Sequence, residues 1–168
     1  MKQTINISDF LRTGEFGRVQ VNDSLKIVID KLGEPDGNIN IGKRLKGIHY
    51  GRYEFVFDED GLKSIQNDSF NTKYLELMEF ENDKIIINPE FLNAKRAKNL
   101  KEIKKALQDS NIQFSIFDYY ERKAIKTVGN VIIDFNDEKW SDRENTLVKI
   151  KNKEDFKLVG FRYHPKDK

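Results

Sequence analysis

The residues that most often carry catalysis or bind metals are scarce in this chain. Its 168 residues include two histidines, His49 and His164, and no cysteine. The histidines lie far apart, and neither belongs to an HxH, HExxH or HxxxH pattern. Because a transition-metal site needs three or four histidine, cysteine or carboxylate ligands, we expect no metal centre. Without cysteine, the chain cannot form disulfides, iron–sulfur clusters or a thiol nucleophile.

Motifs for nucleophilic or phosphate chemistry are equally sparse. The sequence has neither a GxSxG elbow nor an SxxK pair in a suitable context. Gly14 and Gly17 outline a glycine-rich turn, but it lacks a preceding strand, a third glycine and a lysine–serine ending. We therefore predict a helix cap and a bend at this place. Neither a tightly bound organic cofactor nor enzymatic activity is expected.

An acidic run ending in glycine, Asp58-Glu59-Asp60-Gly61, superficially resembles a calcium loop. The twelve-residue ligand pattern fails, and its flanks have the alternation of strands rather than of helices. Gly61 suits a tight hairpin turn because it adopts positive φ angles without strain. The sequence thus favours a turn over a calcium site.

Two charged regions remain as candidate binding surfaces. The acidic one comprises Asp58, Glu59, Asp60, Glu81 and Asp83, at two predicted hairpin turns. The basic one comprises Lys95, Arg96, Lys98, Lys101 and Lys105, on one predicted helix. Acidic turns are able to complement a basic cleft of a partner, and a basic helix is able to bind nucleic acid or an acidic protein. The alternatives are protection of sheet edges and a solvated helix face.

Composition limits the choice between these surfaces. The chain has 30 basic and 28 acidic side chains and a net charge of +2. A nucleic-acid-binding protein usually has a clear basic excess, because its affinity comes largely from neutralised phosphates. Apolar residues make up 38% of the chain, which is enough for a core. The sequence contains no apolar run of signal-peptide or membrane-span length, so it predicts a cytoplasmic protein.

In the first half, helices are predicted over 9–13 and 25–32, and strands over 48–50, 53–57 and 62–66. A second hairpin is predicted over 74–80 and 84–87, with a loop over 36–46. In the second half, a helical region over 90–110, with a break near Asn99, precedes strands over 113–118, 124–128 and 131–135. A long loop over 135–146 and final strands over 147–150 and 156–163 follow. The predicted core comprises Leu25, Val28, Leu32, Phe55, Phe57, Leu62, Ile65, Leu100, Ile103, Leu107, Ile133 and Phe135.

The fold class is predicted to be α+β, with two halves, 1–88 and 89–168, in one unit. Each half begins with a helix and continues as a three-strand antiparallel meander. Residues 24–32 resemble 99–107, and 61–65 resemble 146–150. A tandem duplication that shares one curved sheet would explain this similarity, and so would a chance alignment of two amphipathic segments.

Three motifs in the first seventy residues suggest a family. They have the forms FLRxGxFG (10–17), LGEPD (32–36) and YGxxEFxF (50–57). With these motifs the chain resembles uncharacterised bacterial proteins that are similar to immunity proteins of polymorphic toxin systems. The helix-plus-meander plan is also similar to β-lactamase-inhibitor-like modules. The second half resembles this group only through its helix, the strand at 129–135 and spacing.

The resemblance implies a binding protein that neutralises a cognate bacterial toxin by occluding its surface. Its partner would be a toxin domain, with neither nucleic acid nor a membrane involved. It implies no catalytic residue. The competing hypotheses are a nucleic-acid-associated or regulatory module that uses the basic helix, and an enzyme with an unrecognised carboxylate site. The acidic turns are the predicted contact region in the first case.

Overall fold

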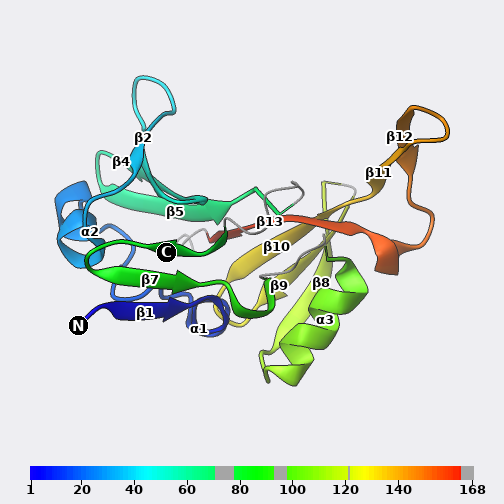
Figure 1. Cartoon of the computed structure of the whole chain (residues 1–168), viewed down its shortest axis with the longest axis horizontal. Helices are drawn as coiled ribbons and strands as arrows, with labels where there is room; N and C mark the ends of the chain where they lie inside the picture. The colour runs from blue at the N-terminus through cyan, green and yellow to red at the C-terminus, as the bar shows by residue number, and fades with distance from the viewer. Residues whose placement is uncertain (71–77, 93–97, 121, 164–168) are drawn as a thin grey trace.

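A computed structural model describes residues 1–70, 78–92, 98–120 and 122–163 of the chain. Its largest element is an eight-stranded sheet in which every neighbouring pair is antiparallel (Figure 1). From edge to edge its strands are β2 (Gly37–Asn40), β3 (Lys46–Tyr50), β4 (Tyr53–Asp58), β5 (Gly61–Asn67), β13 (Lys157–Tyr163), β10 (Val131–Asn136), β9 (Arg122–Thr127) and β8 (Phe114–Tyr119). The α+β class is confirmed.

Two stretches of the chain build this sheet in the same manner. Helix α2 (Leu25–Leu32) leads into β2, β3, β4 and β5, and α3 (Leu100–Asp109) leads into β8, β9, β10 and finally β13. Each stretch is a meander of four strands, one more than the sequence predicts. The last strands of the two meanders, β5 and β13, pair in the middle of the sheet. The strand order on one side of this pair therefore mirrors the order on the other.

Smaller elements cover or extend the large sheet. A second sheet consists of β1 (Gln3–Asn6), β7 (Ile85–Asn88) and β6 (Phe80–Glu81), and its β1–β7 pair is parallel. Helix α1 (Ile7–Thr13) follows β1 directly. Figure 1 shows β1, β7, α1 and α3 on one side of the large sheet. Two segments project from the other side: the β2–β3 loop, and the hairpin of β11 (Glu138–Ser141) and β12 (Thr146–Lys149).

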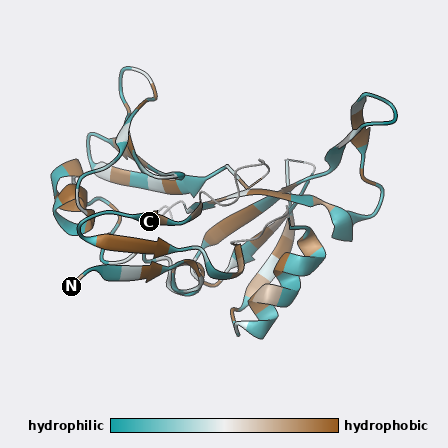
Figure 2. Cartoon of the chain, viewed as in Figure 1, coloured by the Kyte–Doolittle hydropathy of each residue, from teal (hydrophilic) through white to brown (hydrophobic). Residues whose placement is uncertain are grey.

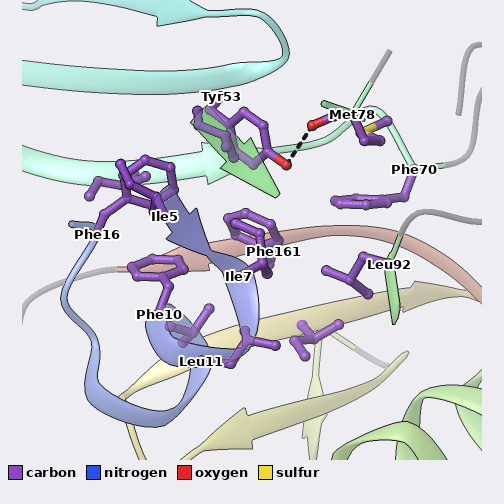
Figure 3. Close-up of a cluster of buried hydrophobic side chains, with 14 of the residues drawn as sticks. Ile5, Ile7, Phe10, Leu11, Phe16, Tyr53, Phe70, Met78, Leu92 and Phe161 are labelled. Carbon is purple, nitrogen blue, oxygen red and sulfur yellow. Dashed lines mark hydrogen bonds between the residues drawn. The ribbon is translucent and has the colours of Figure 1, made fainter. Parts of the chain in front are cut away.

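The hydrophobic core lies between the large sheet and the elements on that first side. In Figure 3, Phe10 packs against both Phe16 and Phe161 of β13, with ring centroids 5.3 Å apart for Phe10–Phe16 and 5.6 Å apart for Phe10–Phe161. Figure 2 shows apolar residues along β7 and β10 and polar ones over much of α3. The predicted core residues are all buried except Leu25, which is half-buried against the core.

Local sequence signals place most helix ends where they were predicted; the exception is the start of α1, which begins at Ile7, two residues before its predicted first residue. The Ser24 hydroxyl accepts a hydrogen bond from the Ile27 N–H at 3.3 Å and caps α2. Asn99 and Glu102 form a reciprocal capping box at α3. Gly14 ends α1 with a φ of 77°, a left-handed conformation that suits glycine. The predicted break near Asn99 is thus the start of α3, and a 3₁₀ turn covers Glu90–Leu92.

Several predictions of local structure were wrong. Residues 37–40, assigned to a loop, form β2, because β3 offers a free edge for pairing. The predicted loop 135–146 instead contains β11. Strand β1 was not predicted at all, since its pairing with β7 joins segments about 80 residues apart. Residues 71–77 and 93–97 carry parts of a predicted hairpin and helix and lie outside the described residues.

The two internal similarities have different outcomes. Residues 24–32 and 99–107 lie in α2 and α3, which take equivalent places before their meanders. Residues 61–65 lie in the central strand β5, but 146–150 overlap β12 in the separate hairpin. The topological counterpart of β5 is β13, so this second similarity does not join equivalent strands.

Candidate functional site

The strongest candidate site is the face of the large sheet opposite the core, which we call the outer face. Strand register places one residue from each of the eight strands in a row across this face: Gly37, His49, Glu54, Gln66, Arg162, Ile132, Lys126 and Ser115. Each member of this row is half-buried or exposed. The adjacent row, on the inner face, includes the buried residues Ile48, Phe55 and Ile65. Among the described residues, no helix covers the outer face (Figure 1).

Hydrogen bonds fix the polar side chains at the centre of this face. The Gln66 amide donates to the Glu54 carboxylate at 2.7 Å. On the neighbouring strand, Arg162 donates through Nε and Nη2 to the two oxygens of Asp68, at 3.3 and 3.0 Å. Bidentate pairs of this kind hold both partners in one geometry. The centre of the outer face therefore presents carboxylates and a guanidinium in preset positions.

Asp134 completes this central group. It lies on β10 opposite Gly160, two residues along from the place where Ile132 faces Arg162. Its Oδ1 is buried and has no hydrogen-bond partner among the described residues. Burial raises the pKa of Asp134, although the nearby guanidinium of Arg162 opposes that shift. A buried carboxylate oxygen without a donor is energetically unfavourable, which agrees with the raised pKa of this group.

The β8 end of the outer face is aromatic. The rings of Phe117 and Tyr119 have centroids 5.8 Å apart, and those of Tyr119 and Tyr120 are 4.7 Å apart in an edge-on arrangement. Tyr120 is 84% exposed and has a φ of 46°, so the tight β8–β9 turn holds this ring out in solvent. Tyrosine supplies large contact area at a small entropic cost, and it is common in interface hot spots.

Basic side chains lie beside the aromatic end. Lys126 is exposed and has no ion-pair partner among the described residues, and Arg122 lies 4.0 Å from a carboxylate oxygen of Asp137. Across the sheet, Glu54 and Asp68 give the opposite charge. The outer face thus carries side chains of both charges, several of them paired with each other, and such a face is suited to a partner of mixed charge.

The predicted acidic turn lies at the margin of the outer face. Asp58, Glu59 and Asp60 form the β4–β5 turn, which is a hairpin turn as predicted. The Lys63 ammonium lies 3.4 Å from Asp58 and 3.6 Å from Asp60. Glu59 has no ion-pair partner among the described residues. An open groove of about 990 Å³ separates this turn from the β2–β3 loop, and its far wall is formed by Lys43, Arg44 and Leu45 of that loop and by Lys46 of β3.

The second acidic turn lies elsewhere. Glu81 pairs with Lys2, and Asp83 lies beside Gly33 at the C-terminal end of α2. Gly61 of the first turn instead packs against the backbone of Asn22 and Asp23, just before α2 begins. The two turns are therefore at opposite ends of α2, and they do not form one acidic edge.

The basic helix is described only in part. Lys101 and Lys105 are exposed on α3, and Lys98 is half-buried just before it. Lys105 forms an ion pair with Asp109, and the neighbouring Lys104 pairs with Glu154. Lys95 and Arg96 lie outside the described residues. Acidic partners from the same chain thus offset part of the charge of this surface.

The structure describes one of the two histidines. His49 lies in the outer-face row, its ring is over Gly37, and its Nδ1 is buried without a partner among the described residues. His164 lies outside the described residues. In the described part of the chain, no three histidine, cysteine or acidic side chains converge as metal ligands would, and no helix is long and apolar enough to cross a membrane.

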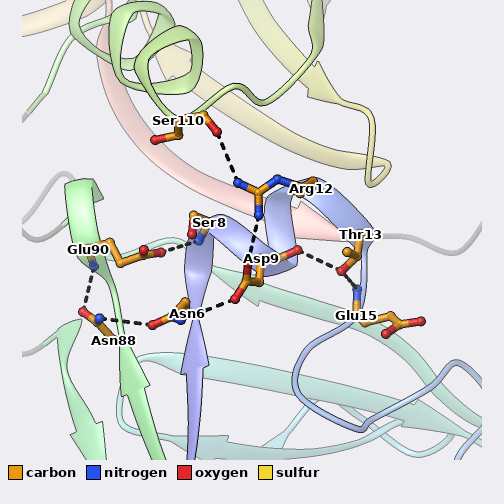
Figure 4. Close-up of polar contacts among 9 residues, drawn as sticks. All are labelled: Asn6, Ser8, Asp9, Arg12, Thr13, Glu15, Asn88, Glu90 and Ser110. Carbon is orange, nitrogen blue, oxygen red and sulfur yellow. Dashed lines mark hydrogen bonds and ion pairs between the residues drawn. The ribbon is translucent and has the colours of Figure 1, made fainter.

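A second polar cluster surrounds α1 and joins the two halves (Figure 4). The Glu90 carboxylate accepts from the Ser8 N–H at 2.6 Å, which satisfies a donor in the first turn of α1. Arg12 donates to Asp9 at 2.8 Å and to the Ser110 carbonyl at the end of α3 at 3.2 Å. All of these side chains bind other parts of the same chain, so this cluster serves the fold.

Sequence reasoning missed the centre of the outer face. The predicted strands 131–135 and 156–163 include Asp134 and Arg162, but no role was predicted for either residue. Asp68 lies 94 residues from its partner Arg162. One signal was present, since Asp134 and Asn136 alternate with the apolar residues Ile133 and Phe135. Comparisons of the chain with family models, with curated proteins and with solved structures give no significant match.

Proposed function

We propose that this chain is an immunity protein, a binding module that neutralises a bacterial toxin by covering the toxin's functional surface. The outer face of the large sheet is its binding surface. The observation that carries the proposal is the fixed polar group of Glu54, Gln66, Arg162, Asp68 and Asp134 on a face that no described helix covers.

Preorganisation supports a role in binding. An inhibitor needs a rigid surface, because ordering side chains on association costs free energy. The hydrogen bonds at the centre of the outer face already hold their side chains in place. The tyrosines at the β8 end and the two projecting segments in Figure 1 add contact area around that centre. A sheet face of this kind suits occlusion better than catalysis.

Charge at the margin supports a basic partner surface. Toxins that attack nucleic acids have basic clefts, because their substrates are polyanions. The turn of Asp58, Glu59 and Asp60 lies at the end of the outer face, where carboxylates would speed association with such a cleft. Glu81 and Asp83 lie at the other end of α2, so they do not share one acidic contact surface with that turn.

The arrangement of the sheet also supports an origin by tandem duplication. The two helix-plus-meander units meet at the β5–β13 pair, and each contributes four strands. Such a duplication would double the width of one curved binding face without a new fold. Under this proposal the central row of side chains lies across the junction of the two repeats.

The test uses the chain as bait in a lysate of its native host, with three matched variants. The first reverses two carboxylates at the centre of the outer face (Glu54→Lys with Asp68→Lys), the second reverses the acidic turn (Asp58→Lys, Glu59→Lys and Asp60→Lys), and the third reverses the basic helix (Lys101→Glu with Lys105→Glu). We expect the wild type and the third variant to retain one protein that the first variant loses. The second should associate more slowly and with a weaker dependence on salt.

The captured protein then decides the function. Expressed alone, it should stop bacterial growth, and co-expression of the wild-type chain, but not of the outer-face variant, should restore growth. A captured protein without toxicity would refute the immunity function. Loss of binding in the basic-helix variant alone, or a salt-dependent shift of oligonucleotides, would favour the nucleic-acid-associated alternative.

A further inference from the structure

The two edges of the large sheet differ in how they are protected. Strand β2 has four residues, two of them asparagine and one glycine, and the following loop carries two basic residues, Lys43 and Arg44. Short polar strands with nearby charges are poor templates for pairing with another chain. Strand β8 has six residues, Phe114 to Tyr119, with neither a proline nor a bulge in its pairing with β9. Its single charged side chain, Asp118, is paired with Lys123 at 2.6 Å.

The hydrogen-bond pattern shows which groups β8 directs away from the sheet. The Val128 N–H donates to the Gln113 carbonyl at 2.9 Å, which fixes the alternation along the β8–β9 ladder. In an antiparallel pair, every second residue bonds to the neighbouring strand and the residues between point the other way. The backbone N–H and C=O groups of Phe114, Ile116 and Asp118 therefore face outward, where no described strand pairs with them.

We propose that β8 pairs antiparallel with β8 of a second copy of this chain, around a two-fold axis at Ile116. In this register Ile116 faces Ile116 of the other copy, and Phe114 faces Asp118 in both directions. The backbone groups of Phe114, Ile116 and Asp118 then all form hydrogen bonds with β8 of the other copy. A register shifted by two residues in either direction leaves the backbone groups of one of these residues without a partner. No like charges stand opposite each other, as they would if the axis lay at Asp118.

Burial of Ile116 gives this pairing a hydrophobic contribution. Ile116 is 43% exposed in the single chain. Phe114, the other apolar residue of β8 on the inner face, is half-buried. Isologous pairing brings two such isoleucines together, and buried apolar area stabilises association. The two eight-stranded sheets would join into one, with both outer faces on the same side. This inference does not depend on the proposed function.

The absence of cysteine from the sequence makes a direct test possible. Ile116→Cys places the only thiol of each chain at the proposed axis, where Cα atoms of a hydrogen-bonded pair are about 5.5 Å apart, within disulfide range. Leu147→Cys is the matched control, because Leu147 is 57% exposed and lies on β12, away from β8. Under mild oxidation, Ile116→Cys should give a cross-linked dimer much faster than Leu147→Cys.

Sedimentation provides the second measurement. The wild type should show a concentration-dependent dimer, and Ile116→Lys should weaken its association roughly tenfold or more, since it places like charges on the axis and removes the apolar contact. Leu147→Lys should leave it unchanged. Circular dichroism would show whether the variants fold, and Ile116→Ser replaces Ile116→Lys if that variant does not. A wild type that stays monomeric at its highest soluble concentration, or equal cross-linking of the two cysteine variants, would overturn the proposal.

Discussion

The inner and outer faces of the large sheet are made by the same strands, but their side chains are stabilised in different ways. On β4, Phe55 is buried among other aromatic rings, while its neighbour Glu54 lies half-buried and bonds to Gln66. On β13, Phe161 and Arg162 show the same contrast. The inner face gains free energy by removing apolar area from water. The outer face holds polar groups in fixed positions and contributes little to stability.

This contrast separates the residues that determine the fold from those available for function. Substitutions on the inner face should change the free energy of unfolding, and substitutions on the outer face should change binding. Neighbouring residues on one strand provide pairs of variants in which only the face differs.

The largest effect is expected for Phe55→Ala. This ring is buried and lies 5.3 Å from Phe16 and 5.4 Å from Tyr50 between centroids. Removing it leaves a cavity and should lower the free energy of unfolding by about 3–5 kcal/mol. Glu54→Ala, one residue away, should cost no more than about 1 kcal/mol. Denaturant titration measures both, and equal costs would remove the distinction between the faces.

Tyr53→Phe should have the next largest effect. The Tyr53 hydroxyl is buried and donates to the Met78 carbonyl at 2.8 Å (Figure 3). Its loss leaves that carbonyl without this donor and should cost about 1–3 kcal/mol.

Tyr119→Phe on the outer face is the control for Tyr53→Phe. No hydrogen bond of the Tyr119 hydroxyl is found among the described residues, so we expect a change within about 0.5 kcal/mol. A similar loss in both tyrosine variants, measured by thermal or denaturant unfolding, would contradict the assignment.

The inner face was largely predictable from the sequence because its signal is local. Alternation of apolar residues over 53–57 and helical spacing over 25–32 each identify a buried side without knowledge of any partner. Leu25 was the exception, since it lies at the first position of α2, where the core covers it only in part. Caps and turns at Ser24, Asn99 and Gly61 were also predictable, because each acts within a few residues.

The outer face was not predictable, because it depends on which strands meet. The Arg162–Asp68 pair joins residues 94 positions apart, and it exists only because β13 pairs with β5. The sequence gives no register for that pairing. The same limit applies to the acidic turns, which have similar sequences but lie at the two ends of α2. Local patterns locate charged residues on an element, and topology decides which of them become neighbours.

The smallest predicted effect concerns Asp134 on the outer face. Burial raises its pKa in the folded protein, whereas the unfolded chain has an ordinary aspartate pKa of about 3.9. Above that ordinary value, the unfolded state loses its proton before the folded state does. Asp134 therefore makes stability fall as pH rises from its unfolded pKa to its folded pKa. Asp134→Asn, which cannot ionise, should be more stable than the wild type at neutral pH and lose this advantage below about pH 4.

Asp118→Asn is the matched control, with the opposite sign. A hydrogen bond from Lys123 is the main cause that lowers the pKa of Asp118 in the folded protein. Its carboxylate therefore contributes stability above the unfolded pKa, and this contribution disappears as pH falls through the lowered folded pKa. The Asp118→Asn variant should be slightly less stable than the wild type at neutral pH and equal to it in strong acid. Denaturant titrations across this pH range distinguish the two substitutions, and shifts of the same sign would show that burial of Asp134 does not govern its ionisation.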